Sequence, residues 1–242
     1  MNNLFELRER RILVTGANGG IGREFCRIAA MLGAELVITD LSGLDELAGD
    51  LGKQGARVTA CACDKTDRSA VEDLVREAGD IDALVELAAW CPWDDWLEDD
   101  WDSVFQKVMD VNVLGTLHFV RACLPGMAAR RRGTMVLASS VAGRMGGLRA
   151  SPHYVASKGG VNAMMKWLSR IAAPDGVRVN AVAPGPVRTP MTEGVAFDVA
   201  GVPLGRIAEP SEIAWPVAFL CSDAASYMTG TILDVNGGAY MN

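Results

Sequence analysis

The sequence predicts a single α/β domain with a central parallel sheet of seven strands, doubly wound and flanked by helices. Two observations lead to this prediction. Short apolar runs alternate with helix-forming segments from one end of the 242-residue chain to the other, and this alternation is typical of right-handed βαβ crossovers. No linker, repeat or low-complexity tract divides the chain, so residues 1–242 are expected to form one domain. Ligands bind such sheets at the carboxyl ends of the strands, where strand order reverses.

The expected strands are short runs rich in Val, Ile, Leu and Ala. Unbroken apolar runs are characteristic of strands buried on both faces of a parallel sheet. They lie at 10–16, 34–40, 56–63, 81–89, 133–140, 175–185 and 231–238. Cys61 and Cys63 are two residues apart in the third run and are expected to face the same side of a buried strand. Because the chain has only two histidines, no metal site is predicted.

The expected helices lie between these strands. The first follows a glycine-rich turn, has Ile21, Phe25 and Ile28 at helical spacing, and ends at Gly33. The others lie at 44–55, 66–80, about 101–130, 153–173 and 210–222. Pro216 falls past the first turn of the last helix, where a proline costs about 3 kcal/mol. A kink or a later helix start is therefore expected there.

The composition limits the classes of partner. The net charge is −7, which argues against nucleic acid or an anionic membrane as the main partner. The first residues lack the apolar segment of a secretory signal, and no run of about 18 apolar residues predicts a membrane span. Six cysteines without such a signal indicate reduced thiols. We therefore expect a cytoplasmic protein that acts on a small molecule.

A glycine cluster, TGANGGIG at 15–22, follows the first strand and opens the first helix. Gly16 allows a tight turn, Gly20 lets the backbone approach a phosphate, and Gly22 lets the helix pack on the strand. The helix N-terminus then offers free N–H groups and a positive dipole end to a pyrophosphate. A plain strand-to-helix turn is the alternative, but the acid that ends the next strand favours a dinucleotide.

That acid is Asp40, in VITD. A carboxylate at this position can accept hydrogen bonds from both hydroxyls of an adenosine ribose and would repel a 2′-phosphate. The glycine loop contains no Arg or Lys, and Leu41-Ser42 supplies none beside Asp40. The sequence therefore favours NAD over NADP. The alternative role for Asp40 is to cap the turn that leads into Leu44.

Tyr154 and Lys158, in HYVASK, lie four positions apart. The two side chains therefore share one face of a helix, one turn from each other. Taken alone, such a pair indicates a solvated helix face more often than a site.

Six motifs in order change that interpretation: TGANGGIG, MDVNVLG, LASSVAG, HYVASK, VRVNAVAPGPVRTPM and SYMTGTILDVNGG. Together they resemble the short-chain dehydrogenase/reductase family from about residue 10 to the C-terminus, which implies a Rossmann-type fold. The resemblance implies that Asn112, Ser140, Tyr154 and Lys158 are the catalytic residues. Asn112 would hold a water beside the lysine; by itself, an Asn in a helix indicates a local kink or a solvated residue. Ser140 would hold the substrate oxygen, and alternation turns Ser139 away.

Interconversion of a carbonyl and an alcohol by hydride transfer needs a proton donor and acceptor at the oxygen. A free tyrosine has a pKa near about 10 and is a poor base at neutral pH. An ammonium one turn away, together with the positive nicotinamide of NAD+, would favour the phenolate and lower that pKa. Tyr154 is therefore expected to be the general acid/base. Lys158 would tune it and, by resemblance, bind the nicotinamide ribose.

The resemblance also implies the cofactor contacts. They are Gly16, Asn18, Gly19, Gly20, Ile21, Gly22, Asp40, Leu41, Asp64, Lys65, Ala88, Tyr154, Lys158, Pro184, Gly185, Val187 and Thr189. Asp64 would contact the adenine amine; its alternative role is to cap the next helix, which Thr66 or Asp67 could do instead.

One motif departs from the family pattern. Where the family has Asn-Asn-Ala-Gly after the fourth strand, this chain has Glu86-Leu87-Ala88-Ala89. A carboxylate at a buried strand end is costly unless it accepts hydrogen bonds or takes up a proton. We expect Glu86 to accept hydrogen bonds from neighbouring backbone N–H groups and to replace the usual amide as a brace.

Specificity is expected from three segments: the tryptophan-rich loop after the fourth strand, residues 145–153, and a short lid at about 190–205. The predicted pocket residues are Trp90, Trp93, Met145, Leu148, His153 and Met191. For His153 a surface imidazole is the alternative. These residues are mainly apolar, and only Arg144 and Arg149 could clamp a carboxylate. The sequence predicts an apolar secondary alcohol, cyclic or aromatic, or its ketone.

Three functions are compatible with these motifs: an NAD-dependent alcohol dehydrogenase, an NADPH-dependent carbonyl reductase of the 3-ketoacyl type, and a non-catalytic nucleotide-sensing scaffold. Asp40 argues against the second, and the complete catalytic group argues against the third. The resemblance also implies a homotetramer, with which the apolar C-terminal segment is compatible.

Overall fold

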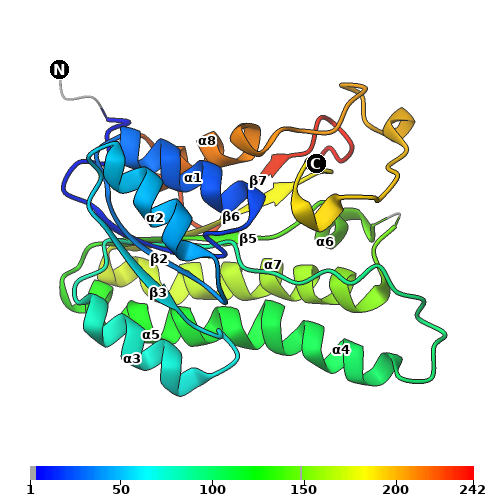
Figure 1. Cartoon of the computed structure of the whole chain (residues 1–242), viewed down its shortest axis with the longest axis horizontal. Helices are drawn as coiled ribbons and strands as arrows, with labels where there is room; N and C mark the ends of the chain where they lie inside the picture. Colours follow the sequence, from blue (N-terminus) through cyan, green and yellow to red (C-terminus); the bar gives the residue numbers. More distant parts are fainter. Residues whose placement is uncertain (1–3, 148) are drawn as a thin grey trace.

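The computed structural model describes residues 4–147 and 149–242, which form a single α/β domain (Figure 1). Within these residues seven parallel strands make one sheet in the order β3-β2-β1-β4-β5-β6-β7. The strands are β1 (Arg11–Thr15), β2 (Glu35–Asp40), β3 (Val58–Ala62), β4 (Ala83–Glu86), β5 (Gly133–Ala138), β6 (Val177–Pro184) and β7 (Ile232–Val235). The predicted fold class is confirmed.

Helices cover both faces of the sheet (Figure 1). One face carries α1 (Gly20–Met31), α2 (Leu44–Lys53) and α8 (Pro210–Cys221); the other carries α3 (Arg68–Ala78), α4 (Trp101–Met109), α5 (Gly115–Ala129) and α7 (Pro152–Ala172). A short α6 (Ala142–Met145) follows β5. Each face has its own apolar core, one around Phe25 and the other around Phe119 and Met135.

Strand order reverses between β1 and its neighbours, because β1 pairs with β2 on one side and with β4 on the other. The register aligns Thr15 with Thr39 on β2 and with Glu86 on β4. The carboxyl ends of these three strands therefore meet at one edge. This is the edge at which doubly wound sheets bind ligands.

Three local features differ from expectation. The long segment 101–130 is two helices joined by a π-helical turn at Asp110–Leu114, and such turns often mark functional sites. The helix α8 begins at Pro210 and runs through Pro216, so a later start is wrong. The strand β3 lies at the edge of the sheet, so Cys61 and Cys63 are half-buried rather than inside a covered strand.

The side chains of Cys61 and Cys63 do share one side, as expected, and pack against the Phe119 core. Among the described residues, no helix combines the length and the apolar character needed to cross a bilayer.

Candidate active site

The glycine loop is shaped by close backbone contacts. A Cβ at Gly22 would lie 2.0 Å from the Gly16 carbonyl oxygen, and one at Gly16 would lie 2.7 Å from the Ala88 nitrogen. A Cβ at Gly20 would lie 2.7 Å from Cγ2 of Thr189. Gly16 also has a φ of +64°, which glycine adopts without strain. Gly16 and Gly22 thus fit the predicted tight turn and close packing of the helix, because a side chain at either position would clash with protein backbone.

The helix α1 starts at Gly20, and in the described chain no side chain caps its N-terminus. Its first N–H groups therefore remain available to an anion, and the helix dipole adds a partial positive charge. The segment Pro184–Thr189 returns to the same edge from β6, and Thr189 lies against Gly20. The site residues from the first and sixth strands thus meet as predicted for a dinucleotide.

Asp40 braces the loop from the end of β2. One carboxylate oxygen accepts from the Asn18 N–H at 3.0 Å, and the other accepts from the Leu41 N–H at 2.8 Å. Each oxygen keeps a second acceptor site for a ribose hydroxyl. Asp40 does not cap α2, whose N-cap is Gly43.

A cation that sequence reasoning missed lies beside this loop. Arg23 on α1 donates from Nε to the Asn18 side-chain oxygen at 2.9 Å and pairs with Glu46 at 3.1 Å. Its position one helical turn after Gly20 was the available signal. Both partners therefore hold the Arg23 guanidinium beside the loop.

Asp64 and Lys65 follow β3 but behave differently. The Asp64 carboxylate accepts from the Thr66 N–H at 2.8 Å and the Thr66 hydroxyl at 2.7 Å, while Asp67 caps α3. Asp64 is therefore not the helix cap. Lys65 is buried, and its ammonium pairs with Glu86 and donates to the Ala88 carbonyl at 2.8 Å. Its side chain points under the loop, toward Glu86 and Ala88, and the expected contact between Lys65 and the cofactor stays a prediction.

Glu86, 2% exposed, lies in a buried network of side chains. Its carboxylate accepts from the hydroxyls of Thr15 and Thr116, each at 2.9 Å, and pairs with Lys65. The expected backbone donors are wrong, because the Leu87 and Ala88 N–H groups donate to the Thr15 hydroxyl at 3.2 Å. Glu86 stands where the family has an asparagine, and the buried Lys65 ammonium neutralises the charge that this replacement introduces.

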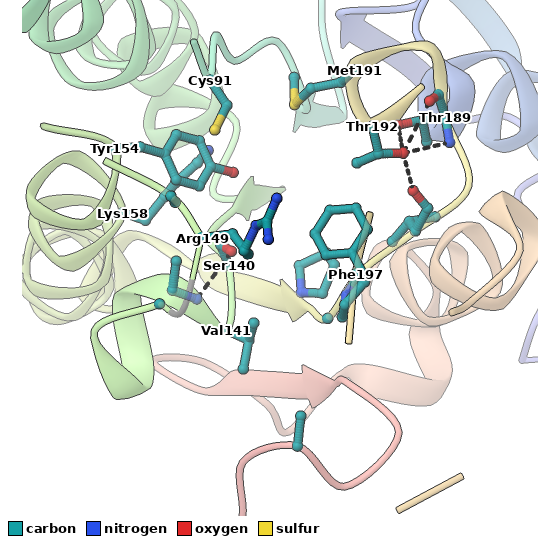
Figure 2. A pocket seen from close by; sticks show the side chains of 18 of the residues that line it. Cys91, Ser140, Val141, Arg149, Tyr154, Lys158, Thr189, Met191, Thr192 and Phe197 are labelled. Carbon is teal, nitrogen blue, oxygen red and sulfur yellow. Dashed lines mark hydrogen bonds between the residues drawn. The ribbon is translucent and has the colours of Figure 1, made fainter. Parts of the chain in front are cut away.

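Ser140, Tyr154 and Lys158 line one pocket of about 400 Å³ (Figure 2). Ser140 follows β5, and its hydroxyl accepts from the Ala142 N–H at 3.1 Å. Tyr154 and Lys158 lie one turn apart on α7, with the ammonium 5.6 Å from the phenol ring centroid. Ile21 and Pro184–Val187 from the cofactor edge line the same pocket. Part of the predicted cofactor edge and three of the four predicted catalytic residues therefore line one cavity, whereas Asn112 does not line it.

The electrostatics of the tyrosine–lysine pair differ from expectation. Burial raises the pKa of Tyr154; the neighbouring Cys91 acts in the same direction, and a hydrogen bond with Ser140 opposes it. Burial also lowers the pKa of Lys158 to about 8, with Glu86 opposing and Lys65 adding to the shift. The Lys158 ammonium donates to the Ala138 carbonyl at 2.7 Å. The chain alone therefore does not lower the pKa of the phenol.

Asn112 lies in the π-helical turn and is 1% exposed. Its side chain accepts from the Trp90 N–H at 2.8 Å and donates to the Trp90 carbonyl at 2.9 Å and the Ser157 hydroxyl at 3.0 Å. Asn112 thus ties the loop after β4 to α7, the helix of Tyr154. The water beside Lys158 stays a prediction.

Three of the predicted pocket residues line the cavity: Trp93, Met145 and Met191. The Trp93 indole donates to the Met191 carbonyl at 2.9 Å and lies edge-on to Phe197 at 5.9 Å. This contact joins the loop after β4 to the segment predicted as a lid. Leu148 lies outside the described residues.

Two predicted pocket residues lie elsewhere. Trp90 is not among the residues that line the cavity; its ring packs under the Lys107 ammonium at 4.6 Å. His153 is fully buried, so neither the pocket nor the surface assignment holds. Its Nε2 lies 2.9 Å from the Asp94 carboxylate, and its ring stacks on Trp101 at 5.3 Å. The Asp94 partner is the physical reason that this imidazole turns inward.

Among the lining residues that sequence reasoning missed, Cys91 and Phe197 bear most on the pocket's character, and Arg149 had been left undecided. Cys91 and Phe197 come from segments already expected to form the pocket, while Arg149 was one of two candidate cations. Burial raises the pKa of the Cys91 thiol to about 12, with Lys158 opposing, so the thiol is neutral at physiological pH. The signal that could have found Phe197 is that it is the one aromatic residue in the segment predicted as a lid, about 190–205.

Comparison with known proteins adds to this geometry. Residues 16–240 match the family model described as "Enoyl-(Acyl carrier protein) reductase". The chain is 36% identical to "Oxidoreductase UcpA" of Salmonella typhimurium over 97% of this chain and 95% of that protein. It is 37% identical to "Cis-4-hydroxycyclohexanecarboxylate dehydrogenase" of Sinomonas cyclohexanicum, over 95% of this chain and 96% of the relative.

Solved structures agree over the whole chain. A putative 2-deoxy-D-gluconate 3-dehydrogenase of Agrobacterium tumefaciens with bound NADP matches with a TM-score of 0.91 and 34% identity, covering 98% of this chain and 99% of that one. A 3-oxoacyl-[acyl-carrier protein] reductase of Brucella melitensis with bound NAD matches with a TM-score of 0.92 and 34% identity. The match covers 98% of this chain and 94% of that one. The chain therefore belongs to the short-chain dehydrogenase/reductase family of nicotinamide-dependent oxidoreductases.

Proposed function

We propose that this protein oxidises an apolar, ring-bearing secondary alcohol to its ketone with NAD+, and catalyses the reverse reduction with NADH. One observation carries the proposal: Ser140, Tyr154 and Lys158 line the same cavity as the edge built from the glycine loop and Pro184–Thr189. A substrate oxygen bound by Ser140 and Tyr154 would then lie beside a nicotinamide held at that edge.

The chemistry assigns one task to each side chain. Bound NAD+ supplies the hydride acceptor for the carbon-bound hydrogen of the alcohol. The Tyr154 oxygen, as phenolate, accepts the hydroxyl proton, so the alcohol loses one hydride and one proton to become a ketone. The Ser140 hydroxyl donates a hydrogen bond to the substrate oxygen. Because burial raises the pKa of the phenol, oxidation should become faster as pH rises, and reduction should be favoured near neutral pH.

The preference for NAD rests on Asp40. Its carboxylate would accept from the ribose hydroxyls and repel a 2′-phosphate, and Arg23 is held by Asn18 and Glu46. The relatives with bound NAD and with bound NADP leave both cofactors open for this family. Initial rates should give a kcat/KM for NAD+ at least about tenfold above that for NADP+. An equal or reversed ratio would favour the 3-ketoacyl-type reductase with NADPH.

The substrate class rests on the pocket wall. Trp93, Met191 and Phe197 supply apolar and aromatic surface, which suits a ring. The relative named as a cis-4-hydroxycyclohexanecarboxylate dehydrogenase supports a cyclic secondary alcohol.

A panel of cyclic, aromatic and linear secondary alcohols with NAD+, followed by nicotinamide absorbance, tests this proposal. Cyclic alcohols should give the highest kcat/KM. If 3-ketoacyl thioesters with NADPH were turned over faster than any cyclic ketone, the second candidate would replace it. If no alcohol or ketone reacted while NAD still bound, the nucleotide-sensing scaffold would be favoured.

We also propose that the enzyme works as a homotetramer in the cytoplasm, as the resemblance implies. Sedimentation equilibrium of the purified chain tests the oligomeric state; a monomer at micromolar concentration would contradict it.

A further inference from the structure

The pocket contains the guanidinium of Arg149, to which the proposed reaction assigns no role. The charged side chains lining it, within the described residues, are Arg149, Lys158 and Asp198. Lys158 donates to the Ala138 carbonyl, and Asp198 accepts from the Ala200 N–H at 2.9 Å at the start of a 3-10 turn. Arg149 has no hydrogen-bond or ion-pair partner in residues 4–147 and 149–242. It is therefore the unpaired cation of this pocket.

Arg144, the other arginine near the pocket, is already occupied. Its guanidinium pairs with Asp234 at 3.1 Å and lies 4.9 Å from the centroid of the Tyr240 ring, and the side chain is only 11% exposed. Arg144 therefore ties α6 to the C-terminal segment and has no free edge for a ligand. Of the two arginines that sequence reasoning left open, Arg149 alone remains available.

Arg149 is an exposed residue on the wall of the pocket. Figure 2 shows its side chain projecting into the pocket, drawn between Tyr154 and Phe197. The remaining wall is mostly apolar, with Trp93, Met191 and Phe197 among its residues. A guanidinium forms two parallel, charge-assisted hydrogen bonds with a carboxylate, and the exposed Arg149 side chain can reach a ligand that enters the pocket from solvent.

We propose that Arg149 binds a carboxylate on the substrate, so that the natural substrate is a ring-bearing hydroxy acid or keto acid rather than a neutral alcohol. This inference rests on the proposed function, in which Ser140 and Tyr154 hold the oxygen at the reacting carbon. A substrate that places its hydroxyl at Tyr154 and its acid group at Arg149 would be fixed at two points. Apolar surface from the lid would cover the ring between them.

The pocket offers one competing partner for Arg149, the Asp198 carboxylate on the lid. If the two side chains paired when the lid closed, Arg149 would act as a latch for any substrate, charged or neutral. Substrate charge separates the two roles, because a latch affects acids and amides alike.

Binding of a matched pair of unreactive probes tests the proposal without requiring turnover. Cyclohexanecarboxylate and cyclohexanecarboxamide have the same ring and differ in charge. Calorimetric titration into the enzyme with saturating NADH should give a dissociation constant for the carboxylate at least about tenfold below that for the amide. Equal binding of the two probes, or failure of the carboxylate to bind, would overturn the proposal.

Variants assign the effect to one side chain. In Arg149→Gln the preference for the carboxylate over the amide should disappear. In Arg149→Lys about half of the logarithm of that preference should remain, because lysine keeps the charge but cannot form the paired hydrogen bonds. Arg121→Gln is the matched control, because Arg121 is an exposed, unpaired arginine on α5 outside this pocket. A preference that survives in Arg149→Gln would overturn the proposal.

Asp198→Asn separates the anion site from the latch. For an anion site, removing this carboxylate should leave the preference for cyclohexanecarboxylate intact or increase it. If Asp198→Asn and Arg149→Gln instead weakened both probes equally, the latch would be correct and the anion site wrong. Failure of the proposed oxidation would appear separately, as absence of NAD+-dependent turnover of cyclohexanol. The binding constants of the two probes would still test the anion site at Arg149 independently.

Discussion

The two sides of the pocket are built in different ways. The cofactor side consists of backbone packed at van der Waals distance, with a buried network of Thr15, Glu86 and Lys65 beneath it. The substrate side consists of side chains from three distant segments, and its lining residues Trp93 and Met191 are each 40% exposed. Changes on the first side should therefore damage folding and cofactor binding, whereas changes on the second should alter substrate affinity.

The largest effect is expected at Gly22. In Gly22→Ala the added Cβ would lie 2.0 Å from the Gly16 carbonyl oxygen, so the loop and helix α1 must separate. We expect NAD affinity to fall at least about 100-fold and the melting temperature to drop, since overpacking costs about 1–3 kcal/mol or more. Calorimetric titration with NADH measures the affinity.

Gly49→Ala is the control for this change. Gly49 is exposed on α2, and a Cβ there meets nothing within 4 Å. Alanine in a helix interior should stabilise by about 0.5–1 kcal/mol. Equal NAD affinity in the two variants would refute the close-approach argument.

The buried ion pair should give the next largest effect. In Glu86→Gln the Lys65 ammonium stays buried without its counter-charge, which typically costs about 3–5 kcal/mol. For a domain of this size that corresponds to a fall in melting temperature of roughly 6–20 °C.

The double variant Glu86→Gln/Lys65→Met tests whether the loss belongs to the pair. It should be less destabilised than Glu86→Gln, because no unpaired charge remains. Thermal denaturation followed by circular dichroism measures both; additive losses would count against the pair.

Lys158, where the two sides meet, should give a pH-dependent effect on stability. Its pKa is about 8 in the folded protein, lowered by burial from an ordinary value of 10.5. Between these values the unfolded chain binds more protons, so wild-type stability should rise with pH. The gain over this interval should be at most about 3 kcal/mol.

Lys158→Met should lack this rise in chemical denaturation performed between pH 8 and pH 10.5. Parallel stability curves for variant and wild type across that range would contradict the lowered pKa.

The smallest effect is expected on the substrate side, at Asp94. Burial would raise the pKa of this carboxyl, but hydrogen bonds from Ser151 and His153 outweigh it and hold the pKa below the ordinary value of 3.8. Asp94 therefore stabilises the folded state above its unfolded pKa, and this contribution is lost as pH falls through the lowered pKa. Asp94→Asn should cost about 1 kcal/mol at pH 7.

Steady-state kinetics with Asp94→Asn sharpen the comparison between the two sides. The KM for the alcohol should rise more than the KM for NAD+, because Asp94 lies in the loop that carries Trp93 and joins it to His153 beside Tyr154. A larger change in the KM for NAD+ would mean that the two sides are not separable.

The sequence predicted the fold and the tight glycine turn at the end of β1 because both depend on local patterns. Apolar runs specify buried strands, and the spacing of Gly16, Gly20 and Gly22 specifies the turn. The partners of Glu86 could not be predicted, since Lys65 and Thr116 are 21 and 30 positions away and reach it from the loop after β3 and from helix α5 only in the folded chain.

The substrate side was harder to predict, because it depends on the orientation of individual side chains, which residue spacing in the sequence does not specify. His153 turns inward because the Asp94 carboxylate lies beneath it, and Trp90 turns away to pack on Lys107. Arg149 is exposed and lacks the acidic partner and the stacked ring that hold Arg144. The orientation of each of these side chains depends on residues distant in the sequence, and their positions are set only by the folded structure.

The most direct test of the account is the rate of NAD+-dependent oxidation of cyclohexanol by the wild-type protein and by Tyr154→Phe, measured at pH 9. The phenylalanine keeps the ring in the pocket but removes the oxygen that accepts the proton. We predict measurable turnover by the wild type and a loss of at least about 100-fold in kcat for the variant, with NADH affinity unchanged. Turnover by Tyr154→Phe at the wild-type rate would contradict the account.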